Sequence, residues 1–149
     1  MKQQIIAQGA EAVIYYNGNF VIKNRLPKGY RHPELDKKII KSRTKSEAKI
    51  LTRASEIINC PKPFFVPLAD FSKIKMPFID GKKLSENLDN LKNKFEIMQI
   101  VGQETAKLHD NNIIHGDLTT SNMILVESNK CNKTNKPINN KTTHNNQGG

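Results

Sequence analysis

The chain has 149 residues, of which 36% are hydrophobic, and this is enough for one compact domain but not for two. Its uncharged apolar stretches, such as residues 64–69, are far too short to cross a bilayer, and the N-terminus lacks the apolar core of a signal peptide. We therefore expect a soluble, cytoplasmic protein that does not enter a membrane. Cys60 and Cys131 match no metal-ligand spacing and are too few for a disulfide framework, so we expect both to be reduced.

The net charge of +10 is unevenly distributed, because residues 23–53 contain eleven basic and only three acidic side chains. Such a segment attracts polyanions through counterion release, which favours RNA or an acidic protein surface as a partner. No aromatic side chains alternate with the basic ones to provide stacking platforms for bases. A solvated helix face therefore remains an equal alternative.

Two β-rich runs, 13–16 and 20–23, flank Asn17-Gly18, a dipeptide typical of tight hairpins. A preceding run from Ile5 breaks at Gly9, so the chain is predicted to open with three antiparallel strands. From Pro33 to about residue 58 the apolar positions recur at helical spacing, which predicts one long helix or two helices joined near Ser42.

Further along the chain, residues 64–68 and 73–79 predict two more strands, which brings the sheet to five. A short helix is predicted over 84–88 and a longer one over 92–110. Residues 113–114 and 123–126 are predicted as short strands on either side of the polar loop 115–122. The Asn- and Lys-rich residues 129–149 cannot bury a core, so we expect them to be disordered. Apolar residues are predicted to line one face of the longer helix, namely Phe95, Met98, Val101, Thr105 and Leu108.

The loop 115–122 carries the most specific chemical signal of the sequence. His115, Asp117 and Asn122 have the His-x-Asp-Leu-x-x-x-Asn spacing of a kinase catalytic loop. In such a loop Asp117 accepts the proton of the attacking hydroxyl or orients the nucleophile, and Asn122 ligates a metal ion through its amide oxygen. His115 is expected to pack and to hydrogen-bond within the loop. The alternative is an Asx-turn loop with a buried histidine.

Lys23 ends a predicted strand and Glu47 lies in the predicted helix that follows, the order in which a kinase places the lysine and glutamate of its phosphate-binding ion pair. Without that order both would be read as surface charges. Residues 9–12, Gly9-Ala10-Glu11-Ala12, occupy the place of a phosphate-binding loop but keep a single glycine. The Glu11 carboxylate would repel phosphates unless it binds a metal or pairs with a basic residue such as Lys23.

Residues 76–79 are predicted to connect two lobes and to contact adenine through the backbone. Pro77 lacks an N–H but keeps the carbonyl that would accept a hydrogen bond, and Ile79 keeps the N–H that would donate one. A core strand with an edge proline is the alternative for this segment. The predicted ATP-binding set is Ile6, Gly9, Ala10, Glu11, Ala12, Ile14, Lys23, Glu47, Met76, Pro77 and Ile79.

Taken together, residues 8–12, 23–36, 43–51 and 115–125 resemble the small atypical kinase of the KEOPS complex, and the resemblance extends over residues 5–127. It includes the Lys-x-Tyr-Arg-His-Pro segment at 28–33, which ordinary kinases lack. The resemblance implies a protein-kinase-like α+β fold with a five-stranded N-terminal lobe over 1–79 and a helical second lobe beginning at 80–128. It also implies a Ser/Thr kinase or ATPase that uses ATP and Mg²⁺. Its partners would be the threonylcarbamoyl-transferring subunit and other KEOPS subunits, and its role would be threonylcarbamoyladenosine formation at tRNA position 37.

The sequence departs from that family after the catalytic loop, because no aspartate follows Asp117. The family places an Asp-Phe-Gly metal-binding segment and further helices there, so we expect an incomplete second lobe and impaired catalysis. A frameshift, an interrupted gene and a mis-set gene boundary stay open as origins. Two alternative functions also stay open: a non-catalytic fragment or binding subunit of a tRNA-modifying assembly, and a free-standing RNA-binding module based on the basic segment.

Overall fold

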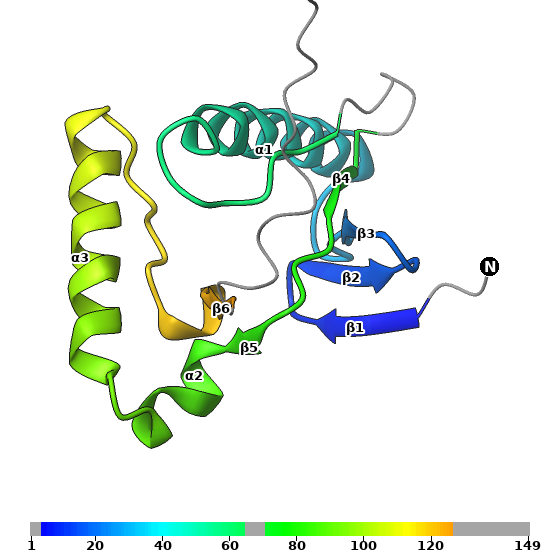
Figure 1. Ribbon diagram of the computed structural model, residues 1–149. Coiled ribbons are helices and arrows are strands. Elements are labelled where there is room, and N and C mark those ends of the chain that lie inside the picture. Colours follow the sequence, from blue (N-terminus) through cyan, green and yellow to red (C-terminus); the bar gives the residue numbers. More distant parts are fainter. Residues whose placement is uncertain (1–3, 65–70, 127–149) are drawn as a thin grey trace, which may run out of the picture.

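The computed structural model describes residues 4–64 and 71–126 (Figure 1). Predictions for the 129–149 tail and for Cys131 therefore lie outside the described residues. Within them, no helix is both long and apolar enough to span a membrane. The elements of the first lobe are β1 (Gln4–Gln8), β2 (Ala12–Tyr16), β3 (Phe20–Arg25), α1 (Pro33–Ala54) and β4 (Lys73–Pro77). Those of the second are β5 (Lys82–Lys83), α2 (Leu84–Asn87), η1 (Leu88–Asn90), α3 (Lys94–Asp110), η2 (Thr120–Asn122) and β6 (Ile124–Leu125).

The first lobe is an antiparallel sheet in the order β1-β2-β3-β4. Its central hairpin turns at Gly18, whose φ of 73° is a conformation that favours glycine. The α+β fold class is confirmed, with four strands in the described part of this sheet. The strand predicted at 64–68 lies outside the described residues except for Phe64, whose backbone N–H donates to the carbonyl of Lys75 on β4 at 2.8 Å.

Helix α1 lies across one side of the sheet and is a single helix that continues through Ser42 (Figure 1). It begins at Pro33, where the missing N–H is not needed, and the acidic Glu34 and Asp36 in its first turn complement the positive end of the helix dipole. It ends at Ala54, about one turn before the predicted end near residue 58.

The two lobes join through a small apolar cluster where the end of α1 meets the end of α3. The buried side chains are Ala54, Leu108 and Ile113, and Cys60 packs against them as a half-buried free thiol. Burial raises the pKa of the Cys60 thiol, which keeps it protonated and unreactive near neutral pH. Arg53 adds a hydrogen bond from Nη2 to the carbonyl of Asn111 at 3.1 Å.

One prediction about this region is wrong, and a second is correct only in part. Residues 113–114 form no strand, because the chain turns sharply at Asn112, with a φ of 56°, and Ile113 then enters the apolar cluster as a single anchor. On α3 the buried side chains are Ile97 and Leu108, whereas Phe95 is 81% exposed and Met98 is 40% exposed. The predicted face therefore holds for the carboxy-terminal half of α3, where Leu108 is buried and Val101 and Thr105 are half-buried, but not for its amino-terminal half.

The catalytic-loop region is tied to the interlobe connection by the short pair of β5 and β6. Their register pairs Lys82 with Leu125 and Lys83 with Ile124. Gly81 lies so close to β6 that a Cβ at this position would be 2.5 Å from the carbonyl oxygen of Leu125. Only glycine fits there without moving the strand, so this residue fixes the distance between the connection and the loop.

Candidate functional site

The centre of the first lobe's polar network is Glu47, on the side of α1 that faces the sheet. Its Oε1 lies 2.7 Å from Lys23 Nζ, and its Oε2 accepts a hydrogen bond from Arg25 Nη2. The ion pair predicted between Lys23 and Glu47 is therefore present. The second cation, Arg25, was not predicted. It lies two residues after Lys23 on β3, and alternate residues of a strand point to the same face.

The strand register places an apolar residue beside this pair. Ile14 on β2 is directly opposite Lys23, and Ile74 on β4 is opposite Lys23 on the other side. Opposite residues of antiparallel strands share a face of the sheet. Ile14 therefore lies next to Lys23, which is required if both residues belong to the predicted ATP site. Ile6, by contrast, lies on the exposed strand β1 beside a register shift between Ile5 and Ala7.

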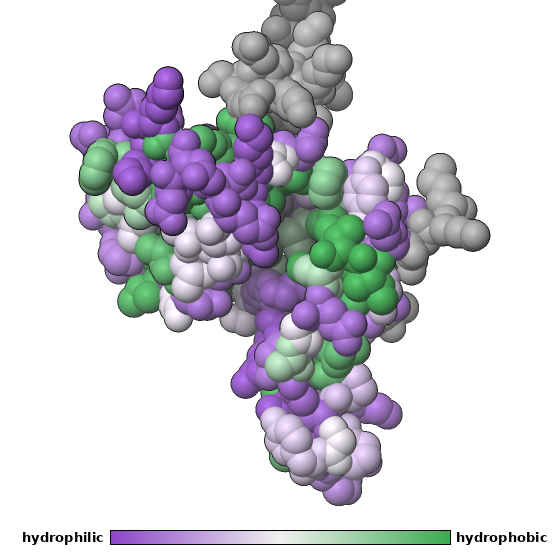
Figure 2. Space-filling view, turned by 90° about the horizontal axis from the view of Figure 1, so that it is seen from below, coloured by the Kyte–Doolittle hydropathy of each residue, from purple (hydrophilic) through white to green (hydrophobic). Residues whose placement is uncertain are grey.

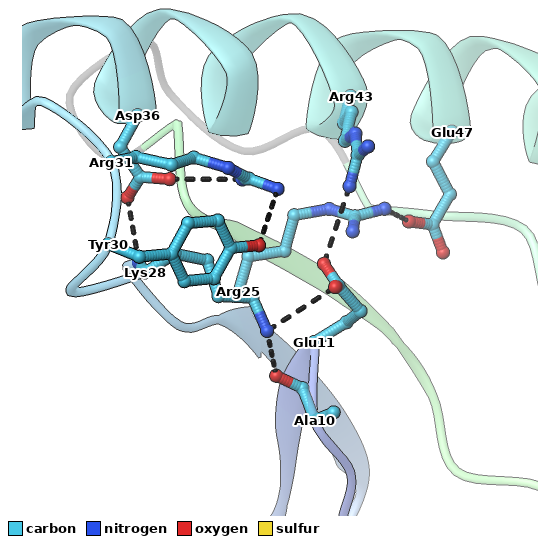
Figure 3. Close-up of polar contacts among 9 residues, drawn as sticks. All are labelled: Ala10, Glu11, Arg25, Lys28, Tyr30, Arg31, Asp36, Arg43 and Glu47. Atoms are coloured by element: carbon cyan, nitrogen blue, oxygen red, sulfur yellow. Dashed lines mark hydrogen bonds and ion pairs between the residues drawn. The ribbon is translucent and has the colours of Figure 1, made fainter.

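The loop 9–12 forms a tight turn in which the Gly9 N–H donates to the Ala12 carbonyl at 3.0 Å. The Glu11 carboxylate does not pair with Lys23. Instead it lies 3.3 Å from Lys28 Nζ and 3.3 Å from Arg43 Nη1 (Figure 3). The hydrogen bond and charge of Lys28, with a smaller contribution from Arg43, hold the pKa of Glu11 below its ordinary value.

The segment between β3 and α1 is ordered by a buried carboxylate, Asp36, which is only 3% exposed. Its Oδ2 accepts the backbone N–H of Lys28 at 3.1 Å, and its Oδ1 accepts from Arg31 Nη1 at 3.1 Å. Arg31 also donates to the Tyr30 hydroxyl at 3.1 Å (Figure 3). The sequence reasoning missed Asp36. Its position could have indicated this role, because Asp36 lies in the first turn of a helix that begins with a proline.

The interlobe connection leaves the sheet where β4 ends. Pro77 is the last strand residue and pairs with Phe20, and the Phe78 N–H then donates to the carbonyl of Asn19 at 3.3 Å. The rings of Phe78 and Tyr16 pack with centroids 4.5 Å apart. These contacts fix the backbone on either side of the Pro77 carbonyl. The adenine contacts of Met76, Pro77 and Ile79 stay predictions.

The catalytic-loop residues converge as their spacing indicates. Asn122 Nδ2 donates to Asp117 Oδ2 at 3.1 Å and to the Asp117 carbonyl at 2.9 Å, and these contacts do not use the amide oxygen that was predicted as a metal ligand. The Asp117 N–H donates to His115 Nδ1 at 3.2 Å, and Gly116 between them has a φ of 75°. His115 hydrogen-bonds as predicted, but it is exposed rather than packed.

These two groups of polar residues belong to different lobes. Seen from below, Figure 2 shows a hollow between the side of the molecule that carries α3 and the side that carries the sheet, and an apolar patch borders it on the sheet side. Across residues 4–64 and 71–126 the structure brings together no cluster of three His, Cys, Asp or Glu side chains that could hold a metal unaided.

Three features together define a protein-kinase-like protein. They are an antiparallel sheet, a strand lysine paired with a helix glutamate, and a His-x-Asp loop beside the interlobe connection. A solved structure of WbdD with a kinase inhibitor has the same fold, with a TM-score of 0.53 over 79% of this chain and 28% of that chain, at 18% identity. The RIO-domain model matches residues 20–134, and the chain belongs to the RIO-domain family.

Curated relatives that are similar to the chain include proteins named as KEOPS subunits, in agreement with the resemblance seen in the sequence. It is 42% identical to the KEOPS complex subunit Bud32 of Pyrococcus abyssi, over 83% of this chain and 62% of that protein. It is 36% identical to an EKC/KEOPS complex subunit of Schizosaccharomyces pombe, over 86% of this chain and 58% of that protein. A probable bifunctional tRNA threonylcarbamoyladenosine biosynthesis protein of Methanobrevibacter smithii is 46% identical, over 84% of this chain and 23% of that protein. The chain therefore spans less than two thirds of these relatives' lengths.

Proposed function

We propose that this chain is the nucleotide-binding part of a KEOPS-type atypical kinase or ATPase that supports threonylcarbamoyladenosine formation at tRNA position 37. The observation that carries the proposal is the 2.7 Å contact between Lys23 on β3 and Glu47 on α1, which sets the lysine in the position that kinases use for phosphates. The names of the relatives supply the assembly and the tRNA modification.

The described residues fit ATP in three parts. Lys23 supplies a fixed cation for the phosphates, and the small residues of the loop 9–12 leave its backbone open to them. Ile14 provides an apolar surface next to Lys23. Ile6, on the neighbouring strand β1, stays a proposed contact that the strand register does not support. The backbone of Pro77 and Ile79 would hold adenine, with Met76 beside it. Each of these contacts is a proposal about this chain's own residues.

The metal site fits Mg²⁺ only in part. Mg²⁺ favours six oxygen ligands and is commonly held by one or two carboxylates together with phosphates and water. Asn122 offers a neutral amide oxygen, Asp117 offers a carboxylate, and no aspartate follows Asp117 in the sequence. Bound Mg²⁺ would neutralise phosphate charge. We assign Asp117 as the group that accepts the proton of an attacking hydroxyl, from a Ser or Thr side chain or from water.

The alternative function is a non-catalytic subunit that contributes its lobe as a binding surface in the same assembly. The exposed apolar residues of α3 and the basic surface of α1 favour this possibility. Phosphate release from ATP, measured with and without the threonylcarbamoyl-transferring subunit, separates the two. We expect release that is near background for the chain alone and rises when the partner is added. A stable complex without any phosphate release would reject the enzyme and support the binding subunit.

The charged side chains of α1 lie on two sides of the helix, one facing the sheet and one facing away from it. Arg43 and Glu47 face the polar network, whereas lysines spaced along the opposite side of α1 are exposed. Two of these lysines also lie over the ring of Phe71, with Lys41 Nζ at 4.1 Å and Lys45 Nζ at 5.0 Å from its centroid. The outer stripe consists of Lys38, Lys41, Lys45 and Lys49. We propose tRNA as its partner.

Reversing the charge of Lys38, Lys45 and Lys49 to glutamate is expected to weaken tRNA binding strongly at low salt and little at high salt. Each phosphate contact contributes roughly 0.7–0.9 to the slope of log affinity against log salt, so the slope should fall by about 2–3. A salt titration with labelled tRNA measures it. The control reverses Lys62, Lys92 and Lys107, which changes the net charge equally. If both triple variants bind alike, the stripe is only a solvated helix face.

A further inference from the structure

Four cationic side chains from three segments gather around the loop 9–12 and Glu47. Lys23 and Arg25 come from β3, Lys28 comes from the segment before α1, and Arg43 comes from α1 itself. Figure 3 shows the last three of these side chains. Among residues 4–64 and 71–126, two carboxylates pair with them, Glu11 and Glu47. The cluster is therefore left with two uncompensated positive charges beside a loop of small residues. That surplus suits a polyanion better than a single carboxylate.

The two carboxylates are held differently. Glu47 lies 2.7 Å from Lys23 Nζ, and its side chain is 22% exposed. Glu11 lies 3.3 Å from both of its cations, and its side chain is 55% exposed. Charge-assisted hydrogen bonds are typically near 2.7–2.9 Å, so the Glu11 contacts are long and open to water. An anionic ligand could therefore replace the Glu11 carboxylate at its two cations, whereas the Glu47 carboxylate would stay paired.

Lys28 is positioned before any ligand arrives. Its backbone N–H is held at 3.1 Å by the buried Asp36, and its Nζ donates to the Ala10 carbonyl at 2.5 Å. Its side chain is only 16% exposed. A lysine that is already ordered loses little side-chain entropy when it binds an anion, which favours a binding role over a solvated one.

We propose that Lys28 and Arg43 are polyphosphate-binding residues, and that the Glu11 carboxylate occupies their position until a nucleoside triphosphate replaces it. The inference rests on the proposed ATP site and adds two cations that the kinase-like motif does not include. No covalent step is involved: Glu11 gives up two ion pairs, and the phosphates take them. The loop 9–12 is released from α1 in the same exchange.

The test is a binding cycle on the full 149-residue chain with ATP, ADP, AMP and inorganic tripolyphosphate as probes. Glu11→Gln keeps the shape and removes the competing charge, so ATP should bind several-fold more tightly. Lys28→Met in the Glu11→Gln background should then weaken ATP binding by about tenfold, the effect of losing one charge-assisted contact. Arg43→Met in that background should act in the same direction. The losses should be largest for ATP and tripolyphosphate and smallest for AMP.

The cycle distinguishes two roles of Lys28. If Lys28 only neutralises Glu11, then Lys28→Met will not change ATP affinity once Glu11 is glutamine, and the inference is overturned. Lys92→Met serves as the matched control, because it removes an exposed lysine remote in sequence from this cluster. Thermal unfolding of each variant shows that the changes act on a folded protein.

Different experimental results would reject the polyphosphate role of Lys28 and Arg43 and the proposed function. ATP binding that depends on Lys23 but not on Lys28 or Arg43 would leave the proposed function standing and reject the polyphosphate role. If the wild-type chain binds neither ATP nor tripolyphosphate, both are rejected. Binding of tripolyphosphate that needs Lys28 and Arg43 but not Lys23 would support the inference and reject the assignment of Lys23.

Discussion

Replacing residues 127–149 with the corresponding carboxy-terminal segment of a KEOPS-type relative is expected to raise magnesium-dependent ATP hydrolysis well above that of the 149-residue chain. The chain itself should turn over ATP near background, because Asn122 is a neutral ligand and the sequence contains no aspartate after Asp117. In the family that the sequence resembles, this segment carries an Asp-Phe-Gly aspartate, which would hold a metal ion. Phosphate release measured with and without Mg²⁺ tests this.

In that chimera, Asp117→Ala should lower the hydrolysis rate by about 10²–10⁴-fold, the usual contribution of a positioned general base. Asp117 is exposed and held by Asn122, so the substitution leaves no buried group unpaired and should not unfold the lobe. Thr119→Ala, at an exposed position of the same loop, is the control. Hydrolysis that survives in Asp117→Ala would remove Asp117 from the mechanism.

The same replacement should also make unfolding more cooperative. Large apolar side chains of the second lobe remain in water, with Phe95 81%, Ile100 56% and Ile114 79% exposed. Each square ångström of apolar surface left in water forfeits about 25 cal/mol of stabilisation. Urea denaturation followed by circular dichroism measures this. A 149-residue chain that already unfolds cooperatively as a monomer and hydrolyses ATP through Asp117 would contradict both of these predictions.

Local sequence signals were sufficient for the hairpin and the ion pair of the first lobe. The Asn-Gly dipeptide placed the hairpin, and the order of strand, lysine and helix placed Lys23 and Glu47, which the structure brings into contact. These predictions succeed because each depends on few residues and on a chain order that leaves little choice of geometry. The Asp117 and Asn122 pair follows for the same reason, since five residues of a tight loop bring the two side chains together.

Other features depend on contacts that local spacing does not encode. Glu11 pairs with Lys28 and Arg43 rather than with Lys23, because the path of the segment before α1 is set by the buried Asp36. Phe95 is exposed and Ile97 is buried, because α3 is oriented by its end, where Leu108 meets α1. In both cases the geometry is set by a contact between residues that are distant in the sequence, and the local sequence pattern does not encode that contact.

Lys23→Ala is expected to weaken ATP binding by about 1.5–3 kcal/mol, which corresponds to roughly 10–150-fold in affinity. The lysine is held 2.7 Å from Glu47 and its side chain is 29% exposed, so its charge acts in a partly dehydrated position. Removing it deletes a phosphate contact and leaves Glu47 with Arg25 alone, which keeps the carboxylate paired. The variant should therefore stay folded.

Titration of a fluorescent ATP analogue into the wild-type chain, Lys23→Ala and the control Lys92→Ala tests the central claim most directly. The account predicts saturable binding by the wild type and by Lys92→Ala, and an affinity at least tenfold lower for Lys23→Ala. Unfolding curves recorded on the same samples establish that all three are folded. Equal affinities of folded wild type and folded Lys23→Ala would contradict the assignment of this lobe as a nucleotide-binding site.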